Sequence, residues 1–118
     1  MDQSISSEII DDYTAVIVTG SELDNNNAHE MFEVIAEKQS KGHFRIIIDM
    51  QKLEFLSSAG VGSIIGTVET SRENGGEIIL CGLSPTIEHI LSVLDLDDYL
   101  TIAKDKETAL TLSRETSK

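Results

Sequence analysis

The sequence of 118 residues contains few basic residues, and this scarcity excludes several classes of binding partner. Nine lysines and arginines stand against twenty-one aspartates and glutamates, which gives a formal net charge of -12 at pH 7. Nucleic acids and anionic lipid surfaces are bound by clustered Lys and Arg, so we expect this chain to bind neither nucleic acid nor membrane. The acidic balance suits a basic protein surface instead, with association that is faster at low salt.

Cysteine, aromatic residues and long apolar runs are also scarce. The single cysteine, Cys81, excludes an intrachain disulfide and fits a reducing compartment, so a cytoplasmic location is expected. No Trp, two Tyr and three Phe leave few rings on which bases or sugars could stack. No apolar run reaches the roughly 20 residues of a membrane-spanning helix, and Met1–Ser4 lack the basic and apolar regions of a secretory signal.

The chain is long enough for one domain with a real core. Its composition, 40% hydrophobic and 25% charged, is that of a globular protein. We expect a single domain over residues 1–118, with its core at about 4–113 and a polar, frayed tail from Ser113.

Strand patterns alternate with helix patterns along the chain. Four helical segments show apolar residues at i, i+3, i+4 spacing or begin at a capping residue. They start near Ala28 (after the possible caps Asn25–Asn27), Ser58, Pro85 and the residue after Asp105. The expected strands are Ser4–Ile10, Tyr13–Thr19, Phe44–Met50, Glu77–Cys81 and Tyr99–Ile102. The alternation predicts an α/β fold with a mostly parallel sheet, and a turn at Asp11-Asp12 adds one antiparallel edge strand.

The segment from Leu53 to Gly66, LEFLSSAGVGSIIG, is the unusual part of the sequence. A short apolar link leads into Ser57-Ser58 at the expected start of a helix. Serine is a good N-cap residue, which is reason enough for one serine there. A helix N-terminus also tolerates a phosphate, because its amides are unpaired and the helix dipole is positive there. The pair therefore predicts either a cap or a phosphate acceptor.

Three glycines, Gly60, Gly62 and Gly66, lie within seven residues of this helix, and each costs about 1 kcal/mol relative to alanine. Close packing of the helix on the sheet would explain Gly62 and Gly66. Gly60 has a second explanation, because a residue without a side chain leaves the Ser58 hydroxyl accessible to another protein. The sequence has no Walker A motif that would make this a nucleotide loop.

Three segments together resemble the STAS domains, in particular the bacterial anti-sigma factor antagonists. The run from Ile48 to Gly66 resembles the family's signature. TGSELD at 19–24, followed by NNNA, resembles the loop before its first helix, and GGEIILCGLSP at 75–85 resembles a later strand, turn and helix. The likeness covers nearly the whole chain in order. It implies a STAS-like single domain with a four- or five-stranded sheet, about four helices and no enzymatic activity.

The resemblance also implies a function and a site. In the family, a serine kinase that is itself an anti-sigma factor phosphorylates one serine, the unphosphorylated form binds that kinase, and a PP2C-type phosphatase resets the switch. The acceptor corresponds to Ser58. The family often has Asp at the preceding position, where this chain has Ser57, so Ser57 is the alternative acceptor. The partner-binding positions carried over are Asp24, Ser57, Ser58, Ala59, Gly60 and Gly62. One extra residue lies in the Asp24 loop, around Ser21-Glu22.

Two alternatives remain open at this stage. STAS-like domains also serve as constitutive accessory subunits of transporters or other complexes, without phosphorylation. Asp49 at the end of a strand has the position of the phosphorylated Asp in response-regulator receivers, but Asp11-Asp12 lies in a turn and Lys104 is poorly placed for that chemistry.

The remaining candidate residues predict no catalytic, metal or cofactor site. The three histidines lack metal-ligand spacing. Cys81 is expected in the core, and the acidic residues of Asp95–Asp98 are expected in a solvated loop.

Overall fold

The computed structural model describes residues 4–115, and the expectations for Met1–Gln3 and for residues 116–118 lie outside the described residues. Its main sheet has five strands in the order β1-β2-β4-β6-β7. Only β1 and β2 are antiparallel, and all other pairs in this sheet are parallel. The predicted sheet with one antiparallel edge is confirmed. The strands are Ser6–Ile9 (β1), Thr14–Val18 (β2), Arg45–Asp49 (β4), Glu77–Cys81 (β6) and Thr101–Ala103 (β7).

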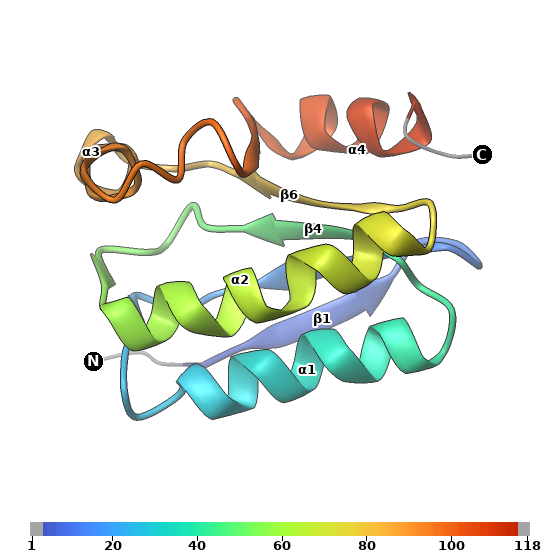
Figure 1. Ribbon diagram of the computed structural model, residues 1–118, viewed down its shortest axis with the longest axis horizontal. Coiled ribbons are helices and arrows are strands. Elements are labelled where there is room, and N and C mark those ends of the chain that lie inside the picture. The colour runs from blue at the N-terminus through green and yellow to red at the C-terminus, as the bar shows by residue number, and fades with distance from the viewer. Residues whose placement is uncertain (1–3, 116–118) are drawn as a thin grey trace.

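Four helices cover the two faces of this sheet. Figure 1 shows α1 and α2 side by side on one face and α4 on the other, with α3 at one end of the sheet. The serine and aspartate predicted as caps do cap: the Ile87 amide donates to Ser84 Oγ at 3.2 Å, and the Thr108 amide donates to Asp105 Oδ1 at 2.8 Å. The helices are Ala28–Ser40 (α1), Ser58–Glu73 (α2), Pro85–Val93 (α3) and Lys106–Glu115 (α4).

The central strand β4 is covered on both faces, as its continuous apolar run indicates. Ile46 and Ile48 belong to the larger core under α1, α2 and α3, while Ile47 belongs to the smaller core under α4. All three side chains are fully buried, because successive residues of a strand point to opposite faces of the sheet. The sheet therefore lies between two apolar layers.

Two features of the fold differ from the sequence-based expectation. Glu22–Leu23 (β3) and Phe55–Leu56 (β5), expected as a loop and a link, pair as a separate parallel two-stranded sheet. The tail expected from Ser113 is also wrong, because α4 continues to Glu115. Ser113 is buried, and its carbonyl accepts a hydrogen bond from Arg45 Nη1 at 3.4 Å. None of the helices within residues 4–115 has the length and apolarity needed to cross a bilayer.

Candidate functional site

The start of α2 is held in place by the small β3–β5 sheet. Leu23 pairs with Leu56, and the Ser57 amide donates to the Leu23 carbonyl at 3.0 Å. The amides of Glu54 and Phe55 both donate to the Ser21 carbonyl, at 2.7 and 3.1 Å. These bonds tie the loop that follows β2 to the link that leads into α2. The segment with the extra residue is thereby fixed against the serine pair.

The two serines at the start of α2 have different environments. Ser57 is the N-cap residue in an extended conformation, and its Oγ accepts a hydrogen bond from the Gly60 amide at 3.1 Å. Ser58 is the first helical residue and is exposed. Its hydroxyl has no hydrogen-bond partner within residues 4–115. Ser57 is therefore the cap that the sequence predicted, while the Ser58 hydroxyl faces solvent.

The glycines of α2 have roles that differ from the sequence-based interpretation. A Cβ on Gly60 would lie 2.5 Å from the Leu23 carbonyl oxygen, so the fold itself requires glycine there. Gly62 has nothing within 4 Å of its Cβ position, and at Gly66 the nearest atom is 3.6 Å away on the Phe32 ring. Close packing thus explains Gly60, and it does not explain Gly62 or Gly66.

The loop before α1 is built from side-chain hydrogen bonds. The Asp24 amide donates to Asn27 Oδ1 at 2.9 Å, and Asn27 Nδ2 donates to the Glu22 carbonyl at 2.9 Å. Asp24 Oδ1 in turn accepts from the Asn26 amide at 2.9 Å. Asn27 occupies the N-cap position of α1 without a side-chain cap bond, so the predicted capping by Asn25–Asn27 is replaced by bracing of this loop. Asp24 is half-buried and directly follows Leu23, which contacts Ser57 and Gly60.

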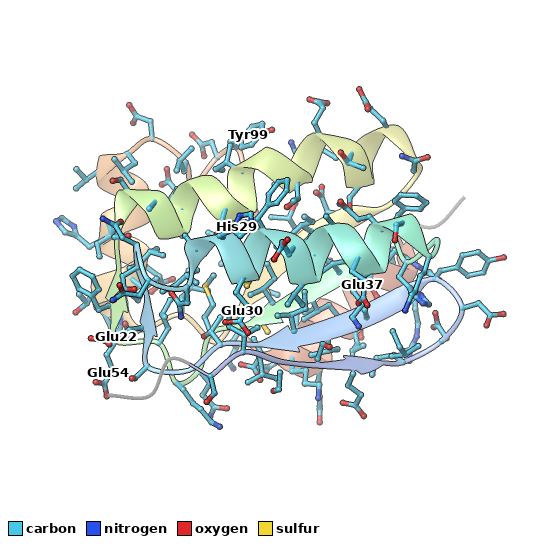
Figure 2. The ribbon with its side chains drawn as sticks, turned by 90° about the horizontal axis from the view of Figure 1, so that it is seen from below. Glu22, His29, Glu30, Glu37, Glu54 and Tyr99 are labelled. Carbon is cyan, nitrogen blue, oxygen red and sulfur yellow. The ribbon has the colours of Figure 1, made fainter. Side chains whose placement is uncertain are left out.

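Acidic side chains gather at this end of the molecule. Figure 2 shows Glu22 and Glu54 close together, as expected from the bond between the Glu54 amide and Ser21. A phosphate on Ser58 would gain at most about 2 kcal/mol from the positive end of the α2 dipole. The arrangement can therefore carry a phosphate without unfolding the helix, and the added charge would act on whatever docks there.

Asp49 lies at the carboxyl end of β4 and accepts a hydrogen bond from the Gln51 amide at 3.0 Å. Lys104, expected to be poorly placed, in fact lines the same surface hollow as Asp49. Asp11 and Asp12 lie in the turn before β2, at the amino ends of the parallel strands, whereas Asp49 lies at a carboxyl end. The structure therefore does not assemble the acidic pair of a receiver domain beside Asp49.

The thiol and the three imidazoles lie on different parts of the fold: Cys81 on β6, His29 on α1, His89 on α3 and His43 between α1 and β4. Cys81 is fully buried on β6, and burial raises the pKa of its thiol to about 11, with the Asp49 carboxylate adding to the effect. His29 on α1 lies 3.4 Å from Glu33, and both side chains are exposed. Within residues 4–115, no three His, Cys, Asp or Glu side chains are grouped as metal ligands.

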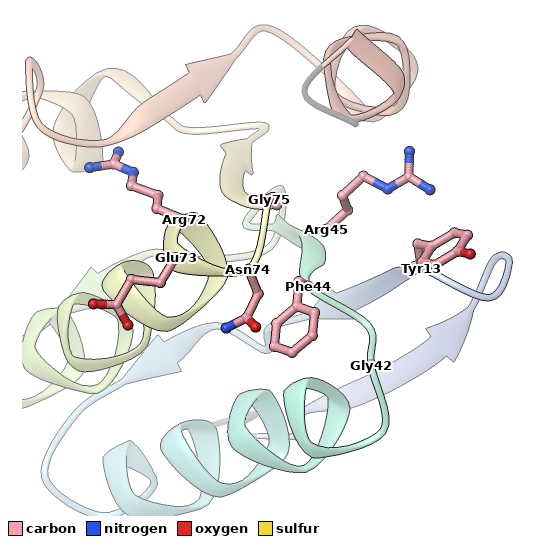
Figure 3. A pocket seen from close by; sticks show the side chains of 9 residues that line it. Tyr13, Gly42, Phe44, Arg45, Arg72, Glu73, Asn74 and Gly75 are labelled. Atoms are coloured by element: carbon pink, nitrogen blue, oxygen red, sulfur yellow. The ribbon is translucent and has the colours of Figure 1, made fainter. Parts of the chain in front are cut away.

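A hollow of about 640 Å³ lies near the C-terminal end of α2, at the opposite end of that helix from Ser58, and is lined in part by Tyr13, Phe44 and Asn74. Figure 3 shows the guanidinium groups of Arg45 and Arg72 directed away from each other at its rim. Arg45 is held by Asp11 at 3.7 Å, and Arg72 by Glu77 at 2.9 Å. Because both guanidinium groups are already paired with carboxylates, neither arginine offers an unpaired positive charge to an anionic ligand in the hollow.

Known proteins resemble this chain in sequence and in fold. An anti-sigma F factor antagonist of Paenibacillus polymyxa is 26% identical over 100 residues, covering 81% of this chain and 83% of the relative. An anti-sigma-B factor antagonist of Staphylococcus aureus is 25% identical over 91 residues, covering 77% of this chain and 84% of the relative. The unphosphorylated anti-sigma factor antagonist SpoIIAA has a similar structure, with a TM-score of 0.82, 26% identity and coverage of 95% of this chain and 97% of that one. The profile of the STAS domain matches residues 4–109, and the chain belongs to this family.

Proposed function

We propose that this protein is an anti-sigma factor antagonist that works by partner switching. The unphosphorylated form binds a serine kinase that is also an anti-sigma factor, phosphorylation of Ser58 ends this binding, and a PP2C-type phosphatase restores it. One observation carries the proposal: the Ser58 hydroxyl is exposed and unpartnered within the described chain, while the Ser57 hydroxyl is engaged with Gly60. The names of the matched relatives support the choice of partner class.

The switch acts through the partner surface. A phosphoserine adds between about -1.5 and -2 charges at pH 7 and three acceptor oxygens. The helix dipole offsets only part of the electrostatic cost of the phosphate, and the neighbouring acidic residues cannot form ion pairs with the phosphate. Repulsion and desolvation at a docked surface can cost several kcal/mol, and a loss of about 4 kcal/mol weakens binding about a thousandfold.

The proposed contact surface surrounds Ser58. Gly62 is exposed one turn further along α2, while Ser57, Ala59 and Asp24 are half-buried at its edge. Gly60 is buried, so it supports the surface rather than touching the partner. The acidic Asp24 loop suits the basic surface that the net charge of -12 favours.

The first experiment locates the phosphate. The purified chain is incubated with its cognate serine kinase and ATP, and the phosphate is counted and mapped by mass spectrometry. We expect one phosphate on the native chain and on Ser57→Ala, and none on Ser58→Ala. Full labelling of Ser58→Ala would show that the acceptor is assigned to the wrong residue.

The second experiment measures the consequence for binding. Ser58→Asp should bind the kinase more weakly than the native chain while its circular dichroism is unchanged. A PP2C-type phosphatase should restore kinase binding to the phosphorylated chain. Equal kinase affinity of Ser58→Asp and the native chain would contradict the mechanism, and a Ser58 that stays unphosphorylated in cells under all conditions would favour a constitutive subunit.

A further inference from the structure

A groove of about 400 Å³ runs between α1 and α2. Phe32 of α1 stands at its edge with 40% of its surface exposed, although it is a large apolar residue. Its ring lies 3.6 Å from the Cβ position of Gly66, so the missing side chain of Gly66 leaves the ring accessible. The other groove residues include Ala36, Gln39, Thr67 and Thr70.

The groove begins within reach of a protein docked on Ser58. Ser58, Gly62 and Gly66 are all exposed and recur every four residues, so they lie on one side of α2. Eight residues of helix rise about 12 Å. A partner of ordinary size covers roughly 800 Å² on each protein, which corresponds to a patch extending roughly 16 Å from its centre. A kinase seated on Ser58 therefore extends to Phe32 and Gly66 if it spreads along α2.

The net charge of the two helices that form the groove selects its occupant. The two helices carry five acidic and two basic residues, and the basic ones are already paired: Lys38 with Glu37 at 3.1 Å, and Arg72 with Glu77 at 2.9 Å. A second copy of this chain, with its charge of -12, would be repelled. The acidic residues are Glu30, Glu33, Glu37, Glu69 and Glu73.

We propose that the groove between α1 and α2 is a second contact of the serine kinase, which inserts an apolar side chain against Phe32 from a segment flanked by Lys or Arg. The proposal rests on the proposed function and adds to it a contact outside the Ser58 surface. Large side chains that fill a pocket on the partner, with polar residues around them, are the usual sources of binding energy in protein interfaces. Glu69 and Glu73 of α2, three and seven residues after Gly66, lie within about 60° of Gly66 around the helix, so both are on the Gly66 side of α2.

The experiment measures the affinity of the full chain for the purified kinase by calorimetry, with a non-hydrolysable ATP analogue present. Phe32→Ala should weaken binding at least tenfold. Alanine is the best helix former and Phe32 is only partly buried, so the variant should fold, which circular dichroism verifies. Phe32→Leu, which keeps an apolar side chain, should recover most of the affinity.

Two double variants test the charge of the rim. Glu69→Gln with Glu73→Gln removes two charges from the Gly66 side of α2 and should weaken binding about threefold to tenfold. The matched control, Glu30→Gln with Glu37→Gln, removes the same number of charges from a side of α1 that is turned about 140° or more from Phe32. Figure 2 shows both control residues, Glu30 and Glu37, along α1. The control pair should change the affinity by less than twofold.

The outcomes separate the two proposals. If Ser58 is phosphorylated but Phe32→Ala and the Glu69, Glu73 pair bind like the native chain, the groove contact is wrong and the switch stands. If both double variants weaken binding equally, only overall charge matters and the groove contact is again wrong. A native chain that takes no phosphate and binds no kinase removes the switch, and the groove contact with it.

Discussion

Gly60 faces the carbonyl of Leu23 so closely that a methyl group on Gly60 would lie 2.5 Å from that oxygen. The same carbonyl accepts the Ser57 amide at 3.0 Å. One backbone oxygen therefore both anchors the cap of α2 and excludes a side chain two residues after Ser58. The close approach joins the Asp24 loop to the helix that presents the candidate phosphate acceptor.

This contact predicts opposite effects for two neighbouring glycines. Gly60→Ala should lower the free energy of unfolding by about 2 kcal/mol, because backbone atoms must shift to admit the methyl group. Gly62→Ala has open space and should raise it by about 1 kcal/mol through helix propensity. Urea unfolding measures both, and equal stability of the two variants would contradict the assigned contact.

The two serines should also differ in their contribution to stability. Ser57→Ala removes the cap bond to the Gly60 amide and should lower the free energy of unfolding by about 1 kcal/mol. Ser58→Ala removes an exposed hydroxyl without a partner and should change it by less than about 0.5 kcal/mol. Thermal or urea unfolding compares them, and a larger loss in Ser58→Ala would mean that the cap is assigned to the wrong serine.

Asp105 should make the stability depend on pH in acid. Hydrogen bonds from the Thr108 amide and hydroxyl lower the pKa of its carboxyl group from the usual 3.8. The ionised form is thus favoured in the folded chain, so its stabilisation is present above pH 3.8 and is lost as the pH falls through the lower folded value.

Asp105→Asn keeps a capping side chain that does not titrate. Its urea midpoint should therefore fall less steeply below about pH 4 than that of the native chain. Parallel curves for the two proteins would show that the Asp105 carboxyl group does not contribute to the acid sensitivity.

Cys81 should be unreactive in the folded protein. Its side chain is fully buried, and burial raises the pKa of the thiol to about 11, so almost no thiolate is present at pH 8. Ellman's reagent at pH 8 should react slowly with the native chain and rapidly with the chain unfolded in urea. Rapid reaction of the native chain would mean that β6 opens readily.

The main elements could be predicted because each has a local signal. The run Ile46–Ile48 indicates a strand buried on both faces, and Ser84 and Asp105 mark helix starts by capping chemistry. The strands β3 and β5 have no such signal. A strand of two residues is too short to show hydrophobic periodicity, and each residue of β3 pairs with a residue of β5 more than 30 positions later in the chain.

At the candidate site, the sequence by itself determined that a helix begins at a pair of serines followed by glycine, a pattern that suits a cap or a phosphate acceptor equally well. Only the tertiary structure decided which of the two serines caps the helix. The Leu23 carbonyl fixes the Ser57 amide and requires glycine at Gly60, whose own amide then takes the Ser57 hydroxyl as its acceptor. Ser58 is left one position into the helix, exposed and without a partner for its hydroxyl, because the long-range contact with Leu23, which no local pattern encodes, fixes Ser57 as the cap.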